Sequence, residues 1–192
     1  MIPVVQRAFL LKASKAWTKA VKPREIAVAG RLDVVARTLM AALVEPYRRF
    51  TLFMTVLEGP PKPPLLLMVD GSKAHVPGSE EEFARIYSEL IQGGTVNGYQ
   101  VKRSSFRETV NMARRAGYNV YYLYELGNDI RGNFKLVLPA LFILGDHLGL
   151  TSKEEKWLFK SGIRGVSIGP ISYFASHCIL IVHEEISRRY PG

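Results

Sequence analysis

The amino-acid sequence predicts an α/β fold in which a mostly parallel sheet is flanked by helices. Strand-like apolar runs alternate with amphipathic helical segments along most of the chain, a pattern typical of strands joined by crossover helices. The chain has 192 residues, of which 47% are hydrophobic, which is enough for one domain with a buried core. We therefore expect residues 1–192 to form a single domain that binds ligands beyond the carboxyl ends of its strands.

The first half of the chain is expected to form three strands and two helices. The strands are the apolar or β-branched runs Gln6–Lys12, Thr51–Leu57 and Leu65–Val69. One helix is expected at Asp33–Val44, because its valines and leucines recur at helical spacing. The other spans Ser79–Ile91, where three glutamates follow the serine at the positive end of the helix dipole.

The second half is expected to alternate helices with strands. The helices are Ser104–Ala116, Thr151–Lys160 and Ile171–Arg189, and the strands are Asn119–Tyr124, Pro139–Leu144 and Gly165–Ile168. Pro170 suits the start of the last helix, and Glu125–Asn133 is expected to be a polar loop. The exits of the three strands, after Tyr124, Leu144 and Ile168, are therefore candidate site loops.

The charge of the chain favours a polyanionic partner. Lys and Arg number 26 against 17 Asp and Glu, a net charge of +9, which attracts nucleic acid or anionic lipid. Basic pairs with aromatic neighbours occur at Arg48-Arg49, Lys102-Arg103 and Arg114-Arg115. Such mixtures suit RNA, because cations bind phosphates and rings stack on unpaired bases. The basic stretch Ser14–Arg24 is either a solvated face or part of such a surface.

Several other protein classes are disfavoured. No apolar run approaches the roughly 20 residues of a membrane-spanning helix, and Gln6 and Arg7 interrupt the N-terminal run, so neither a span nor a signal peptide is expected. The single cysteine, Cys178, cannot form an internal disulfide, which favours a cytoplasmic protein. His177, Cys178 and His183 lack metal-ligand spacing, so no metal is expected.

The segment Gly165-Val-Ser-Ile-Gly169 matches the nucleophile elbow of serine hydrolases. That fold requires an acid and then a histidine after the serine. Here His177 is the first histidine after Ser167, and no Asp or Glu lies between the two. A hydrolase is therefore disfavoured.

Two glycine-bearing turns follow expected strands, Leu144–Gly149 and Ser167–Pro170. Glycine lets a ligand approach the backbone closely, and free N–H groups at a helix start can donate to it. These turns either hold an adenosine moiety through main-chain hydrogen bonds or are ordinary structural turns.

Three segments in order, AGRLDVVARTLMAAL, FILGDHLGLT and RGVSIGPISYFASHCI, resemble the archaeal tRNA pseudouridine N1-methyltransferases, the TrmY family of the SPOUT superfamily. The piece NGYQVKRSSFRETV is also similar, so the resemblance covers nearly the whole chain. It implies a SPOUT-type domain with a C-terminal trefoil knot, an exception to the rule against knots. It also implies a homodimer with the C-terminal helix at or near the interface.

The resemblance further implies that S-adenosylmethionine binds in the knot and that the substrate is pseudouridine at position 54 in the T-arm of tRNA. The cofactor contacts that it implies are Leu123, Gly145, Ile168, Gly169, Pro170, Ile171, Ser172, Tyr173 and Cys178. One departure is Tyr124, which stands where the family usually carries a histidine before the acid.

Methylation of N1 of pseudouridine must remove its proton, and a nearby carboxylate could accept it. Asp33 is the catalytic candidate, with Arg31 holding the base or its phosphate and Asp129 as the alternative to Asp33. Asp33 is equally suited to a structural role as an N-cap or first-turn acid. Two other functions stay open: a related methyltransferase acting on pseudouridine in ribosomal RNA, and a non-catalytic RNA-binding domain of the same fold.

Overall fold

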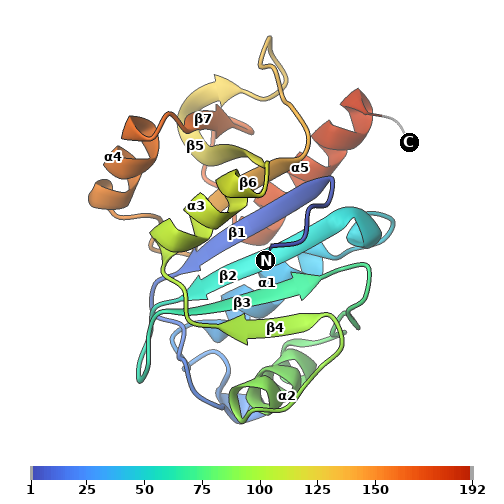
Figure 1. Cartoon of the computed structure of the whole chain (residues 1–192), viewed down its shortest axis with the longest axis vertical. Helices are drawn as coiled ribbons and strands as arrows, with labels where there is room; N and C mark the ends of the chain where they lie inside the picture. Colours follow the sequence, from blue (N-terminus) through green and yellow to red (C-terminus); the bar gives the residue numbers. More distant parts are fainter. Residues whose placement is uncertain (1, 191–192) are drawn as a thin grey trace.

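The computed structural model describes residues 2–190 and consists of a seven-stranded sheet with helices on both faces (Figure 1). The strands are β1 (Arg7–Ala13), β2 (Thr51–Leu57), β3 (Leu65–Asp70), β4 (Tyr99–Lys102), β5 (Asn119–Asp129), β6 (Ala140–Gly145) and β7 (Arg164–Ser167). The α-helices are α1 (Leu32–Ala42), α2 (Glu80–Ile91), α3 (Phe106–Arg115), α4 (Ser152–Lys160) and α5 (Ala175–Arg189), and Pro23–Glu25 and Arg48–Phe50 are short 3-10 turns. Across the described residues, no helix is both long enough and apolar enough to cross a bilayer.

The sheet has the strand order β4-β3-β2-β1-β6-β5-β7. Four of its six neighbouring pairs are parallel, and the two antiparallel pairs are those that β3 forms with β2 and β4. The predicted α/β class with a mostly parallel sheet is therefore confirmed. Because β1, β2, β5, β6 and β7 all run in one direction, their carboxyl ends lie along one side of the sheet, which we call the carboxyl edge.

The central strand β1 shows how the two cores form. All of its residues are buried, as expected for a strand covered on both faces. Phe9 and Leu11 belong to the core beneath α1, α2 and α5. Ala8 and Leu10 point the other way, into the core beneath α3 and α4. This alternation of side chains along the strand lets one sheet bind two layers of helices.

The largest differences from the sequence prediction concern β4, β5 and α5. Strand β4 was not expected, because the short run Tyr99–Lys102 lies among glycines and polar residues; it pairs antiparallel with β3 at the sheet edge. Strand β5 continues to Asp129, where a polar loop was expected, because an irregular register after Leu123 lets it pair again with β7. Helix α5 begins at Ala175 rather than Ile171, because the preceding residue, Phe174, is extended.

His183 of α5 is a fully buried histidine. Its Nε2 lies 3.0 Å from the carbonyl oxygen of Ala42, and its ring stacks on Tyr47 at 4.6 Å. Burial, together with the nearby guanidinium of Arg7, lowers the pKa of His183 to about 3. The imidazole is therefore neutral in the folded protein at any pH near neutrality.

This histidine is expected to make the fold sensitive to acid. Below about pH 6.5 the unfolded chain protonates His183 and the folded chain does not, so stability falls as pH decreases, by roughly 1.4 kcal/mol per pH unit at most. Urea unfolding between pH 7 and 4 should show a shallower pH dependence for His183→Gln than for the exposed-site control His147→Gln. Parallel curves for the two variants would contradict this expectation.

Candidate functional site

A cavity of about 360 Å³ opens at the carboxyl ends of β6 and β7 and beside the irregular middle of β5. It lies between Leu123 of β5, Leu144 of β6, Val166 of β7 and the segment that leads into α5. Its volume falls in the range of small-molecule sites, and its place matches the rule that parallel sheets bind ligands beyond their carboxyl ends.

The structure brings together eight of the nine residues for which the sequence suggested cofactor contacts. Those lining the cavity are Leu123, Gly145, Ile168, Gly169, Ile171, Ser172, Tyr173 and Cys178. Pro170 lies in the same loop but is not among the lining residues. The three expected strand exits therefore meet at one place.

The loop between β7 and α5 is shaped by a local turn. The Ser167 hydroxyl donates to the carbonyl of Gly169 at 3.1 Å and accepts from the Gly169 N–H at 3.4 Å. A side chain on Gly169 would lie 2.6 Å from the hydroxyl of Tyr173. Ser167 thus serves the turn, and the elbow-like motif has a structural explanation.

The other glycine turn, after β6, is anchored to β1. Gly145 pairs in register with Lys12, and a Cβ there would lie 2.6 Å from the backbone of Gly149. The carboxylate of the next residue, Asp146, accepts from the Ser14 N–H at 2.7 Å and from the Leu148 N–H at 2.9 Å. These contacts hold the backbone of the turn close to the cavity.

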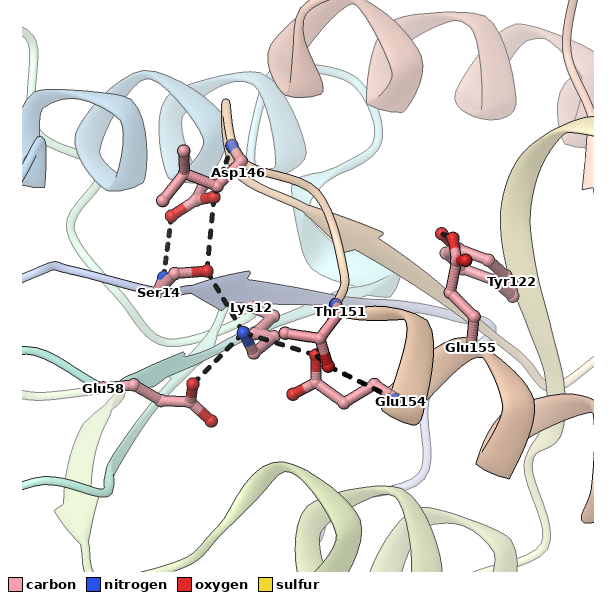
Figure 2. Close-up of polar contacts among 9 residues, drawn as sticks. Lys12, Ser14, Glu58, Tyr122, Asp146, Thr151, Glu154 and Glu155 are labelled. Atoms are coloured by element: carbon pink, nitrogen blue, oxygen red, sulfur yellow. Dashed lines mark hydrogen bonds and ion pairs between the residues drawn. The ribbon is translucent and has the colours of Figure 1, made fainter.

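Behind this turn lies a buried lysine, Lys12, whose ammonium group connects three elements (Figure 2). Its Nζ lies 3.2 Å from Glu58, 3.4 Å from Glu154 and 3.1 Å from the Ser14 hydroxyl. Glu154 also forms a capping box with Thr151 at the start of α4, as predicted for a helix capped near Thr151. The cluster therefore joins the ends of β1 and β2 to α4 and, through Ser14, to Asp146.

The lining of the cavity is acidic although the chain as a whole is basic. Glu125, Asp146 and Glu155 line it, and no Lys, Arg or His is among its described lining residues. The Tyr122 hydroxyl donates to Glu155 at 2.7 Å (Figure 2), and burial raises the pKa of Tyr122, so that it remains a donor. Such a lining favours a cationic ligand.

The sequence interpretation included Asp146 within the candidate turn Leu144–Gly149 but did not identify Glu125 and Glu155 as lining residues. Glu155 lies one position after the capping Glu154 and has the appearance of an ordinary first-turn acid. Glu125 was assigned to a loop that proved to be part of β5. The only available signal was that the helix after the LGDH turn begins at the carboxyl edge, so that acids in its first turn lie near the site.

Cys178 is half-buried and lines the cavity as a free thiol. Burial raises its pKa to about 11, so the group is a neutral thiol near pH 7 and a poor nucleophile. Its sulfur lies 3.8 Å from the carbonyl oxygen of Tyr173. Cys178 is therefore suited to packing against a ligand rather than to covalent chemistry.

The two catalytic candidates, Arg31 and Asp33, lie at the start of α1 and are not among the cavity-lining residues. Asp33 is a buried first-turn acid, not the N-cap, which is Arg31 with φ 65°. Arg31 Nε and Nη2 each donate to Asp33 at 3.0 Å, and Arg37 also donates to it. The hydrogen bonds from Arg31 to Asp33 raise the pKa of Arg31, and the negative charge of Asp146 at the cavity raises it further.

The other candidates lie apart from one another. Asp129 is exposed at the end of β5, pairs with Ser167 and accepts from the Arg131 N–H at 2.9 Å. His177 is exposed and contacts Phe174. Within residues 2–190, no group of three or more His, Cys, Asp or Glu side chains is placed to hold a metal ion.

Comparison with known proteins identifies the family. Residues 6–190 match the profile of a family described as "Putative SAM-dependent RNA methyltransferase". The tRNA (pseudouridine(54)-N(1))-methyltransferase of Methanosarcina acetivorans is 31% identical over 169 residues, which cover 83% of this chain and 80% of that protein. Its namesake from Methanococcus maripaludis strain C5 is 29% identical over 196 residues, which cover 95% of this chain and 98% of that protein.

Solved structures show the same fold at lower identity. Archaeoglobus fulgidus Nep1, solved with S-adenosylhomocysteine bound, gives a TM-score of 0.69 at 16% identity and covers 96% of this chain and 98% of that one. A ribosomal RNA small subunit methyltransferase E from Neisseria gonorrhoeae, solved with S-adenosyl methionine, gives 0.54 at 12% identity and covers 96% and 67%. These likenesses support a SPOUT-like fold.

The family resemblance predicted from three motifs is thus confirmed by matches along nearly the whole chain. The fold carries a cavity at the carboxyl edge, where residues of the second and third motifs converge. The chain belongs to the tRNA (pseudouridine(54)-N(1))-methyltransferase family of SAM-dependent RNA methyltransferases.

Proposed function

We propose that the protein transfers a methyl group from S-adenosylmethionine to N1 of pseudouridine 54 in the T-arm of tRNA. The observation that carries this proposal is the family match over residues 6–190, together with relatives of that activity that are matched along 98% of their own length. The cavity at the carboxyl edge supplies the site.

The cavity fits the cofactor chemically. S-adenosylmethionine carries a sulfonium and an ammonium group against a single carboxylate, so it is cationic overall, and Glu125, Asp146 and Glu155 line the cavity. The apolar side chains of Leu123, Ile168 and other lining residues suit the adenine ring. Leu123, Gly145, Cys178 and the loop from Ile168 to Tyr173, Pro170 included, are the proposed cofactor contacts.

When bound, the cofactor supplies an activated methyl group on sulfur. The N1–C bond forms as the S–C bond breaks, the neutral thioether leaves, and the N1 proton passes to a base. We propose Asp33 for this base and Arg31 for holding the pseudouridine or its phosphate. Asp33 Oδ1 accepts one hydrogen bond from an arginine and Oδ2 accepts two, so Oδ1 keeps a lone pair that can take the N1 proton.

Replacing Asp33 by alanine is expected to slow single-turnover methylation by about 100-fold, the usual range for loss of a general base, while tRNA binding persists. Rapid-quench assays with radiolabelled cofactor measure the rate, and filter binding measures tRNA affinity. Asp129→Ala is the matched comparison, because Asp129 is the alternative candidate and is exposed at the end of β5. Wild-type single-turnover rates in Asp33→Ala would remove Asp33 from the role of base.

The experiment that tests the function is nucleoside mass spectrometry of tRNA incubated with the protein and S-adenosylmethionine. A tRNA bearing pseudouridine at position 54 should gain one methyl on that nucleoside, and the same transcript with uridine there should gain none. Methylation of a ribosomal RNA fragment but not of the tRNA would favour a ribosomal substrate. Calorimetry that detects no cofactor binding would favour a non-catalytic RNA-binding domain.

We further propose that the chain forms a trefoil knot by threading α5 through the loop between β5 and β6. Side chains near the end of α5 bond to that loop: Glu185 to Arg131 at 2.7 Å, and the Tyr190 hydroxyl to the Leu136 carbonyl at 2.7 Å. Helix α5 also packs on α1, whereas β7 lies at the far edge of the sheet. The chain must therefore cross back over the sheet between the end of β7 and the start of α5.

A homodimer with α5 at or near its interface completes the proposal. Large apolar side chains are exposed around the cavity mouth and on α5, among them Ile171, Phe174 and Leu180, and burying such a patch requires a partner surface. Sedimentation equilibrium should give twice the chain mass. We place the enzyme in the cytoplasm, where its tRNA substrate and a free thiol such as Cys178 are both accommodated.

A further inference from the structure

We propose that the RNA lies along the carboxyl edge, with its target base at the cavity and its backbone phosphates in a basic groove at the opposite end of that edge. Lys19, Lys62 and Arg103 form this basic groove. The inference rests on the proposed function, because it assigns the surface that binds the RNA substrate.

The basic groove is a second hollow of about 290 Å³. Its lining residues are Thr18, Lys19, Pro61, Lys62, Leu65, Leu90, Ile91, Val101 and Arg103. They come from the loops after β1 and β2, the start of β3, the end of α2 and the end of β4. Three of these residues are cationic and none is acidic, the reverse of the cofactor cavity, so an anionic ligand is favoured.

The walls of the groove are held by buried hydrogen bonds. The buried Thr18 hydroxyl donates to the Gly59 carbonyl at 3.0 Å and accepts from the Lys62 N–H at 2.8 Å. The Thr18 N–H donates to the Pro60 carbonyl at 2.8 Å. A Cβ on Gly59 would lie 2.1 Å from the Lys15 carbonyl oxygen. The two loops therefore meet closely and fix where Lys19 and Lys62 emerge.

The three cations are free to bind a ligand. Lys19, Lys62 and Arg103 are exposed, and none of them takes part in an ion pair among residues 2–190. The Lys19 ammonium instead lies 4.2 Å from the centre of the Trp17 ring. This half-buried indole holds the ammonium in place and itself offers a stacking surface.

The groove and the cavity open on the same edge of the sheet. Strand β3 runs antiparallel to β2 and therefore starts at this edge, and β4 runs antiparallel to β3 and therefore ends there. In the strand order, β3 lies four strands from β5, which is roughly 19 Å at about 4.8 Å per strand. The exposed Lys15 and Arg31 lie between, in loops that touch at Gly30. A chain of phosphates, rather than a single anion, matches this line of cations.

The other basic pairs identified in the sequence lie at the opposite edge. Arg48-Arg49 immediately precedes β2, and Arg114-Arg115 at the end of α3 precedes β5. Replacing three of these arginines therefore provides a control that removes the same amount of positive charge from the opposite edge of the sheet.

The test compares two triple variants of the full chain in tRNA binding. The variant Lys19→Ala/Lys62→Ala/Arg103→Ala is expected to raise the Kd for tRNA about 10- to 100-fold. It should also make the slope of log K against log salt shallower by about 2 to 3, with cofactor affinity unchanged. The control Arg49→Ala/Arg114→Ala/Arg115→Ala should bind tRNA within about threefold of wild type. Equal losses in the two variants, or none in the first, would overturn the proposal.

A second measurement needs no variant. Wild-type protein is cross-linked by light to tRNA carrying 4-thiouridine around the T-arm, and the attached peptides are mapped. Attachment to the loops at 15–19 and 59–65 supports the groove, and attachment confined to residues 110–118 contradicts it. If the wild-type protein neither binds nor methylates tRNA, the proposed function itself is refuted. If the wild type methylates tRNA and the triple variant Lys19→Ala/Lys62→Ala/Arg103→Ala binds tRNA as well as the wild type does, only the proposed surface is refuted.

Discussion

Replacing Gly145 by alanine is expected to lower kcat/KM for S-adenosylmethionine by about 100-fold. The added methyl group would lie 2.6 Å from the backbone of Gly149, so the turn after β6 must move away from its present place. Because this turn forms one wall of the cavity, its movement narrows or displaces the proposed cofactor site. Steady-state methylation assays at varied cofactor concentration, with calorimetry of cofactor binding, measure the effect.

The control for this variant is Gly78→Ala. Its Cβ would meet only the Glu82 carboxylate, at an ordinary 3.5 Å, and Gly78 lies far from the cavity in the sequence and outside its lining. Thermal melts of both variants show whether any loss reflects unfolding. A folded Gly145→Ala protein with kcat/KM within threefold of wild type would exclude a cofactor role for this turn.

Replacing Lys12 by methionine is expected to lower the melting temperature by about 6–12 °C. The change leaves Glu58 and Glu154 without their shared cation, and their side chains are 31% and 15% exposed. Removing one partner from a largely buried charge cluster costs about 3 kcal/mol, and each kcal/mol shifts the melting temperature of a chain of this size by about 2–4 °C.

The same variant should also reduce methylation more than its lost stability explains. Lys12 donates to the Ser14 hydroxyl at 3.1 Å, and Ser14 donates to the cavity residue Asp146 through its hydroxyl at 3.5 Å and through its backbone N–H at 2.7 Å. Assays well below the melting temperature therefore test Lys12 as a positioning residue. Lys153→Met, an exposed lysine in the same helix as Glu154, is the matched control.

The double variant Lys12→Met/Glu154→Gln separates charge from packing. If the cost of Lys12→Met comes from an unpaired buried carboxylate, neutralising Glu154 should restore about 1–2 kcal/mol of the free energy of unfolding. No recovery would indicate that Lys12 stabilises the fold through packing of its methylenes instead of through its charge.

Periodicity and capping predicted six of the seven strands and all five helices at approximately their observed places. These signals are local: apolar alternation in β1, the serine before the glutamates of α2, and the threonine before α4. Strand β4 was not predicted, because four residues at a sheet edge carry little pattern. The predicted β5 was too short, because the exposed end of the strand is polar.

The candidate site divides in the same way. Glycine turns after β6 and β7 were visible as motifs, and their order along the chain indicated the family. The acidic lining was not visible, because Glu125 and Glu155 are 30 positions apart and meet only when β5 and α4 come together. Likewise, only the direction of each strand separates Lys102-Arg103, on the carboxyl edge, from Arg114-Arg115 on the other.

Local pattern and composition were thus sufficient for the α/β class, the net positive charge, the family and the two glycine turns, because each can be read from the composition or from residues close together in the chain. Folding brought those turns to one cavity, moved Ser167 from a suspected nucleophile to a turn residue, and buried Lys12 between two carboxylates. It also placed cations and carboxylates at opposite ends of one sheet edge. Apart from the local turn at Ser167, these features depend on strand order and direction, which bring together residues far apart in the chain, such as Lys12 and Glu154, and leave no trace in local sequence.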